Sequence, residues 1–139
     1  MPNHKNLKEI FTISELAYDL EVSPPAIRFY EDKGLIAPAR SPGNQRIYNK
    51  KDRARLKLIL RGKRFGFSLD EIAEMIGLAE VDMDEIDQIE HSLIHIDRRC
   101  EDIRQRRIDL ELLEKDLLSF KKKLTIHKKA LKNRDEISM

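Results

Sequence analysis

The sequence has little of what builds disulfide-rich, metal-cluster or membrane proteins: one cysteine, no tryptophan, five glycines and five prolines in 139 residues. Because Cys100 is alone, it excludes an internal disulfide and any metal or iron–sulfur site that needs several cysteines of one chain. No apolar segment follows a basic N-terminus, and no run of about 18 apolar residues occurs. We therefore expect neither export nor membrane spanning, and predict a cytoplasmic protein.

The net charge of +2 hides an uneven distribution of charged residues. Residues 40–64 hold ten basic side chains and a single acid, Asp52, which gives this segment a charge of +9. Residues 80–97 hold seven acids and neither lysine nor arginine. A basic block in an otherwise balanced chain is typical of a protein that binds a polyanion, although a solvated helix face shows the same excess.

Capping residues mark where helices begin. Thr12, Ser23, Ser68 and Asp82 each precede a helical pattern, and all except Ser23 have an acid three residues later that can complete a capping box. Two prolines follow Ser23, where a proline suits the first helical turn. Asn49 gives a weaker start for a helix rich in arginine and lysine. The predicted helices span about 13–20, 24–33, a stretch that begins after residue 49, 69–77 and 83–132.

Between the second and third predicted helices, residues 35–48 favour a hairpin. The stretch contains two prolines and a turn-like sequence at 41–44, so it is not helical throughout. On its second arm, Arg46 and Tyr48 alternate with Ile47. We expect the arginine and the tyrosine to share the outer face of a strand, and Ile47 to pack inward.

The first two helices are separated by only about two residues, Glu21 and Val22, and so short a turn forces a sharp crossing angle. In a helix-turn-helix the second helix presents its first turns to the major groove. Here that helix carries Arg28, Phe29 and Tyr30, and arginine can donate two parallel hydrogen bonds to guanine. An ordinary helical hairpin could carry the same tripeptide, but a basic hairpin and a basic helix following directly favour DNA binding.

Seven short stretches of this region stand in a specific order: Ile13–Ala17, Ile27–Glu31, Lys33–Ile36, Pro38, Arg40, Gln45–Tyr48 and Gly66–Ile72. Over residues 11–78 they resemble the DNA-binding domain of the MerR family of bacterial transcription regulators. The run 53–68 resembles most the branch tied to branched-chain amino acid and fatty acid breakdown genes. The resemblance implies an all-α fold with a small β-hairpin wing, in which a winged helix-turn-helix domain (11–79) precedes a dimerisation helix (80–132). Residues 1–10 would be a flexible N-terminus and 133–139 a disordered tail.

The resemblance also assigns contacts to DNA. Ser14, Tyr30, Arg46 and Tyr48 resemble residues that contact the DNA backbone, and Arg28 resembles one that contacts both base and backbone. Arg61 and Lys63 resemble contacts from the second wing. With Phe29 and Arg40 they form the predicted DNA-binding set. One departure is the first turn of the second helix, Ser23–Ala26, where many relatives carry a longer polar side chain. We therefore expect fewer residues to read bases and more of the selectivity to come from DNA deformation.

After Gly77 the chain lacks glycine and proline, and apolar residues recur every seven positions, as in a coiled coil. A second apolar row moves by one position after Cys100, as expected when a straight helix is compared with a strict seven-residue repeat. The predicted dimer residues are Ile86, Ile89, Leu93, Ile96, Cys100, Ile103, Leu110, Leu113, Leu117, Phe120 and Leu124. The resemblance implies an antiparallel coiled coil of two chains, and the alternative is a helical hairpin within one chain.

Cys100 falls on this stripe and is interpreted as a buried core residue rather than a sensor. His91 and His95 have the spacing of a zinc pair, but the heptad count places both on the solvent face, so we predict no metal site and no cofactor. Metal-sensing relatives carry a cysteine-bearing loop after the long helix, which is absent here. The effector, if one exists, is not predicted.

The sequence thus predicts a homodimeric transcription regulator that binds double-stranded promoter DNA at a two-fold-related site, distorts it and works with RNA polymerase. The alternative is a protein-interaction module that has lost DNA binding, such as a chaperone modulator. No nucleophile, base and orienting residue are grouped and no phosphate-binding loop occurs, so an enzyme is not expected.

Overall fold

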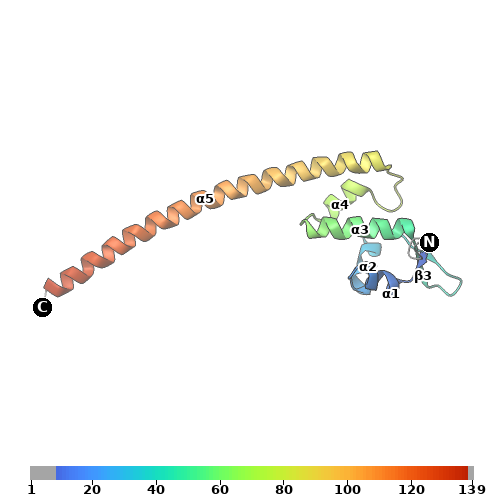
Figure 1. Ribbon diagram of the computed structural model, residues 1–139, viewed down its shortest axis with the longest axis horizontal. Helices are drawn as coiled ribbons and strands as arrows, with labels where there is room; N and C mark the ends of the chain where they lie inside the picture. Colours follow the sequence, from blue (N-terminus) through green and yellow to red (C-terminus); the bar gives the residue numbers. More distant parts are fainter. Residues whose placement is uncertain (1–8, 138–139) are drawn as a thin grey trace, which may run out of the picture. The chain divides into compact units, whose positions relative to one another are not determined.

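The computed structural model describes residues 9–137, and the chain divides into two compact units, Met1–His95 and Ile96–Met139. The elements follow the order β1, α1, α2, β2, β3, α3, α4, α5 (Figure 1). Their bounds are β1 Ile10–Phe11, α1 Ile13–Asp19, α2 Pro24–Asp32, β2 Ala39–Arg40, β3 Arg46–Asn49, α3 Lys50–Arg64, α4 Leu69–Ile76 and α5 Glu85–Ile137. This confirms the mostly helical fold with a small hairpin wing.

The helices begin where the local capping signals predict. Thr12 and Glu15 form a reciprocal capping box, in which the Thr12 amide donates to Glu15 Oε1 (3.0 Å) and the Glu15 amide donates to Thr12 Oγ1 (3.1 Å). Equivalent boxes start α3 at Asn49 and α4 at Ser68. For α5 the predicted start is wrong by two residues: Asp84, rather than Asp82, accepts the amide of Asp87 (2.8 Å), and the helix begins at Glu85.

The three strands form an antiparallel sheet in the order β1-β3-β2. Phe11 of β1 lies opposite Tyr48 of β3, and Ala39 of β2 lies opposite Ile47. Ile10, which the sequence assigned to a flexible N-terminus, therefore pairs with Asn49. Glu9 is exposed and lies outside any strand, and residues 1–8 of that assignment fall outside the described residues.

The hydrophobic core of the first unit joins the sheet to all four short helices. Its fully buried side chains include Leu16, Ile27, Leu35, Tyr48, Leu56, Ile59 and Ile72. Helices α3 and α4 approach closely at Gly62, where an added Cβ would lie 2.8 Å from Ile72 Cγ1. A bulkier residue at 62 would push α4 away from α3.

Arg55 is buried in the same core although it belongs to the basic block. Its guanidinium donates to the carbonyl oxygens of Leu35 (2.9 Å), Ile76 (3.3 Å) and Gly77 (2.8 Å). These bonds tie α3 to the segment that follows α2 and to the end of α4. Arg55 is therefore a structural residue, and its charge is not among the basic charges that face solvent.

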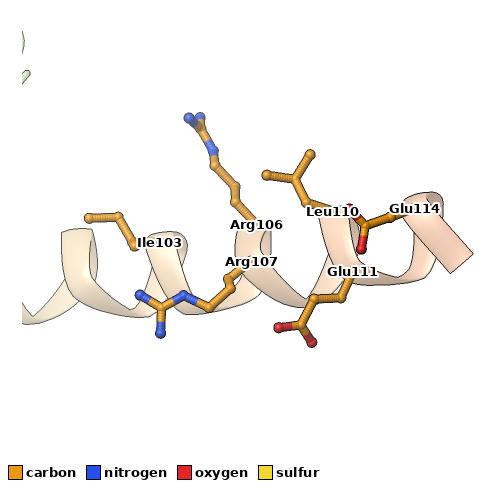
Figure 2. Close-up of a pocket in the computed structure, with 6 residues that line it drawn as sticks. All are labelled: Ile103, Arg106, Arg107, Leu110, Glu111 and Glu114. Carbon is orange, nitrogen blue, oxygen red and sulfur yellow. The ribbon is translucent and has the colours of Figure 1, made fainter.

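In the second unit α5 runs unbroken to Ile137, so no turn forms the helical hairpin considered from the sequence. The predicted tail at 133–139 is wrong for residues 133–137, which are helical, and residues 138–139 lie outside the described part. A shallow groove on one side of α5 is lined by Ile103, Arg106, Arg107, Leu110, Glu111 and Glu114 (Figure 2). Within residues 9–137 no helix has the length and apolarity needed to span a membrane.

Candidate nucleic-acid interface

Helices α1 and α2 meet at a tight turn. Glu21 adopts a left-handed conformation (φ 54°), and the amide of Val22 donates to the carbonyl of Ala17 (3.0 Å). Ser23 then caps α2 by accepting the amide of Ala26 (3.2 Å). This geometry confirms the predicted short connection of a helix-turn-helix.

The exposed side of α2 carries Arg28 and Phe29. Arg28 is half-buried, and Phe29 is 47% exposed with the Lys33 ammonium 5.4 Å from its ring centroid. Ser14 on α1 is also exposed. Tyr30 lies on the opposite side of α2 and is only 8% exposed, so most of its ring packs in the core. Of the predicted tripeptide, Arg28 and Phe29 are accessible to a ligand.

The predicted orientation of β3 is wrong. Tyr48 points into the core with 0% exposure, whereas Ile47 is half-buried. Alternation along a strand fixes which residues share a face but not which face is inward, and here packing against α1 and α3 selects Tyr48. Burial raises the pKa of the Tyr48 hydroxyl, which has no hydrogen-bond partner among residues 9–137. Tyr48 thus serves the core rather than presenting its ring to a phosphate.

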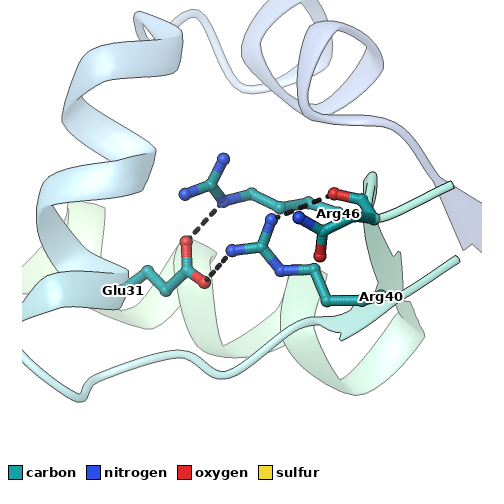
Figure 3. A network of polar contacts seen from close by, with 4 residues as sticks. Glu31, Arg40 and Arg46 are labelled. Carbon is teal, nitrogen blue, oxygen red and sulfur yellow. Dashed lines mark hydrogen bonds and ion pairs between the residues drawn. The ribbon is translucent and has the colours of Figure 1, made fainter.

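The wing arginines are held by a carboxylate that the sequence analysis did not single out (Figure 3). Glu31 at the end of α2 binds Arg46 Nε (2.6 Å) and Arg40 Nη2 (3.5 Å). The Arg46 hydrogen bond to Glu31 raises the pKa of that guanidinium. Arg40 also donates to the carbonyl of Asn44 at the hairpin tip (3.4 Å). Glu31 therefore fixes the wing against the second helix of the helix-turn-helix.

A second group of cations lies at the end of α3. Arg61, Lys63 and Arg64 are all exposed in its last turn, where positive charge also complements the helix dipole. Lys63 donates to the carbonyl of Phe67 (3.4 Å), just before α4 begins. This turn is a second group of exposed cations on the unit, in addition to those of the β2-β3 wing.

Two family models match this chain: MerR HTH family regulatory protein over residues 11–78, and MerR, DNA binding over residues 53–120. The mercuric resistance operon regulatory protein of Bacillus cereus is 35% identical over 117 residues, covering 81% of this chain and 84% of that protein. This chain belongs to the MerR family of transcription regulators.

This chain is also similar to one further regulator by sequence and to two MerR-family regulators of known structure. An uncharacterised regulator from Synechocystis is 38% identical over 85 residues, or 60% of this chain and 62% of that protein. The structure of HiNmlR, a MerR family regulator lacking the sensor domain, bound to promoter DNA, has a TM-score of 0.55 at 25% identity and covers 73% and 76% of the two chains. A lead(II)-bound regulator from Ralstonia metallidurans has a TM-score of 0.59 at 30% identity, covering 78% and 84%.

Two of these relatives are named for a metal, mercury or lead(II). In this chain, within residues 9–137, no three His, Cys, Asp or Glu side chains lie close enough to hold a metal ion. His95 instead packs against α4, contrary to the prediction that it faces solvent. It is 7% exposed, with Nε2 2.9 Å from Glu74 Oε2, Nδ1 3.9 Å from Glu71 Oε2 and its ring edge against Phe67. His91 is exposed, as predicted.

The residues predicted for dimerisation all lie along α5 and are open to solvent in the single chain. Cys100 is exposed, and the apolar members are between 42% and 68% exposed: Ile86, Ile89, Leu93, Ile96, Ile103, Leu110, Leu113, Leu117, Phe120 and Leu124. An exposed apolar stripe of this size marks an interaction surface. Its role in dimerisation stays a prediction.

Proposed function

We propose that this regulator binds promoter DNA as a homodimer, and that each copy reads DNA with α2, the β2-β3 wing and the end of α3. The observation that carries the proposal is that these three elements of one compact unit each present a cation that is at least partly exposed: Arg28, Arg40 and Arg61. The relative HiNmlR, solved with promoter DNA, supports the same use of this domain.

Within the domain the side chains divide by chemistry. Arg28 enters the major groove from the middle of α2 and contacts base edges, while Phe29 packs against sugar or a thymine methyl. Ser14, Arg40, Arg46, Arg61 and Lys63 contact phosphates, which position the protein without reading sequence. Tyr30 and Tyr48 support this surface from the core.

A second copy supplies the second half of the binding site. At about 1.5 Å per residue, the 53 residues of α5 span about 80 Å, far more than one small domain covers. Pairing of two α5 helices would place two α2 helices in successive major grooves of a two-fold-related site, about 34 Å apart. Distortion of the promoter between them would then control its use by RNA polymerase, in the cytoplasm at the nucleoid.

The test is a gel shift on the promoter of the protein's own operon with three variants. Arg28→Ala should weaken binding by about 1–3 kcal/mol and relax the preference at one position of each half-site. Lys63→Ala should weaken all duplexes alike and reduce the salt slope by about one. Lys122→Ala, on α5, is the matched control and should change neither. Absence of binding at low salt by the unaltered protein would contradict the proposal and favour a protein-interaction module.

A further inference from the structure

The first turn of α2, residues 24–27, lies wholly within the part of the chain that the structure describes and offers DNA no free backbone hydrogen-bond donor. Pro24 and Pro25 have no amide hydrogen. The amide of Ala26 donates to Oγ of Ser23 (3.2 Å), and the amide of Ile27 donates to the carbonyl oxygen of the same serine (3.2 Å). Free amides at the start of a helix often bind a phosphate. Any contact between this turn and DNA must therefore come from side chains.

The side chains that α2 exposes here are mostly apolar. Ile27 is buried and Ala26 packs against the core, whereas Pro25 is exposed. Arg28 and Phe29 follow Pro25 by three and four residues, so the three side chains share one face of the helix. Between residues 24 and 29, Arg28 is the only residue whose side chain can donate a hydrogen bond. This face therefore presents one arginine together with two apolar side chains.

Neighbouring side chains hold the Phe29 ring in place. Its centroid lies 5.9 Å from that of Tyr30, which is buried, and 5.4 Å from Nζ of Lys33. Aromatic pairs and cation–π contacts at such distances are attractive. Phe29 nevertheless stays 47% exposed. It is therefore a positioned apolar surface rather than a part of the core.

An apolar side chain in the major groove has one well-matched partner. Thymine alone of the four bases adds a methyl group to the donors and acceptors that base edges present there. An apolar side chain gains by covering this methyl group, whereas over the polar edge of another base it leaves hydrogen-bonding groups unpaired. Arg28 in turn matches the two acceptors of guanine.

The spacing of the three side chains fits neighbouring base pairs. Pro25 and Arg28 are about 4.5 Å apart along the helix axis, at about 1.5 Å per residue. Successive base pairs of a duplex are about 3.4 Å apart. Side chains on this face of α2 therefore reach the same base pair or adjacent ones when the helix enters the groove.

We propose that Pro25 and Phe29 are specificity-determining residues, which read the 5-methyl groups of thymines beside a guanine bound by Arg28. This rests on the proposed function and specifies the class of half-site that the regulator recognises. Selectivity at these base pairs then comes from direct contact as well as from DNA deformation.

Deoxyuridine substitution in the DNA tests the proposal without altering the protein, because it removes only the methyl group of thymine. Each thymine of the promoter duplex is replaced in turn and the affinity is measured by gel shift. We expect about four-fold weaker binding at the thymines that are read, the loss that follows from exposing one methylene-sized group. They should lie within about two base pairs of a guanine whose N7 methylation blocks binding. If no substitution weakens binding, the proposal is overturned.

Variants of the full-length protein assign the methyl groups to side chains. In Phe29→Ala and in Pro25→Ala the effect of deoxyuridine should vanish, each at its own thymine. Lys122→Ala, on α5, is the matched control and should keep the full pattern. If deoxyuridine weakens binding of the unaltered protein and of both variants equally, the methyl groups act through the flexibility of the DNA, which overturns the proposal.

The same measurements separate this proposal from the proposed function. Binding to the promoter that does not respond to deoxyuridine overturns the methyl readout and leaves DNA binding in place. A protein that binds no duplex even at low salt overturns both. Thermal unfolding shows whether each variant is folded. Because the effect is a ratio of two duplexes with one protein, a smaller active fraction cancels.

Discussion

The two units of this regulator bury their apolar residues in different ways. The first unit encloses fourteen hydrophobic side chains in one core, and even an arginine of that core finds three carbonyl partners. In the described part of the second unit, residues 96–137, no side chain is buried. The first unit therefore has a hydrophobic core of its own, whereas the exposed apolar residues of the second are those that the proposed dimer would bury. Destabilising changes in the first should act on folding, and changes on the stripe of the second should act on assembly.

The largest expected effect comes from a charge on the stripe. Leu110→Asp would place a carboxylate on the apolar stripe of α5, where the proposed dimer would desolvate it. We expect a monomer by sedimentation and a loss of at least about 100-fold in promoter affinity, because two linked half-site contacts become one. Leu112→Asp, on the other side of the same helix and 58% exposed, is the control and should leave both measurements unchanged.

A core change should act on folding rather than assembly. Arg55→Ala would leave three buried carbonyl groups without their donor and would remove the positive charge near the buried Asp52. We expect a loss of about 3 kcal/mol in the free energy of unfolding, measured by urea denaturation. Lys57→Ala, exposed on the same helix, should stay within about 0.5 kcal/mol of the unaltered protein. A similar small change for Arg55→Ala would contradict its structural role.

His95 tests where the first unit ends. His95→Ala removes the contacts with Glu74 and Phe67 that hold the first turns of α5 on α4. The free energy of unfolding should fall by about 1–2 kcal/mol, and amide exchange should increase in residues 85–95. His91→Ala, four residues earlier and exposed, should change neither. Equal effects of the two substitutions would mean that His95 does not anchor the helix.

The smallest effect is expected at Tyr48. Its hydroxyl is buried without a hydrogen-bond partner among the described residues, so Tyr48→Phe should change stability by less than about 1 kcal/mol, with stabilisation the more natural direction. Promoter affinity should stay the same in a gel shift, whereas Arg46→Ala should reduce it. Loss of affinity in Tyr48→Phe alone would show that the hydroxyl reaches a phosphate after all.

What the sequence predicts well in this protein is local. The caps at Thr12, Ser23, Asn49 and Ser68 each depend on residues within one turn, and all four appear in the structure. Before α5 two aspartates, Asp82 and Asp84, are equally suitable caps, and the sequence alone does not choose between them. The structure uses Asp84.

What the sequence predicts poorly depends on contacts between distant segments. The inward face of β3 is chosen by packing against α1 and α3, so alternation alone could not orient Tyr48. The burial of His95 depends on α4, about twenty residues earlier, and a heptad count of α5 contains no information about it. Glu31 could have been noticed as a carboxylate on α2 facing two arginines of the wing, Arg40 and Arg46.

The most direct test of the account is sedimentation of the protein with and without a duplex of its own promoter. We expect a dimer alone and a complex of two chains with one duplex, which weakens steeply as salt increases. A monomer that binds one duplex with one chain, or a dimer that binds no duplex even at low salt, would contradict the claim that two copies of this domain act together on DNA.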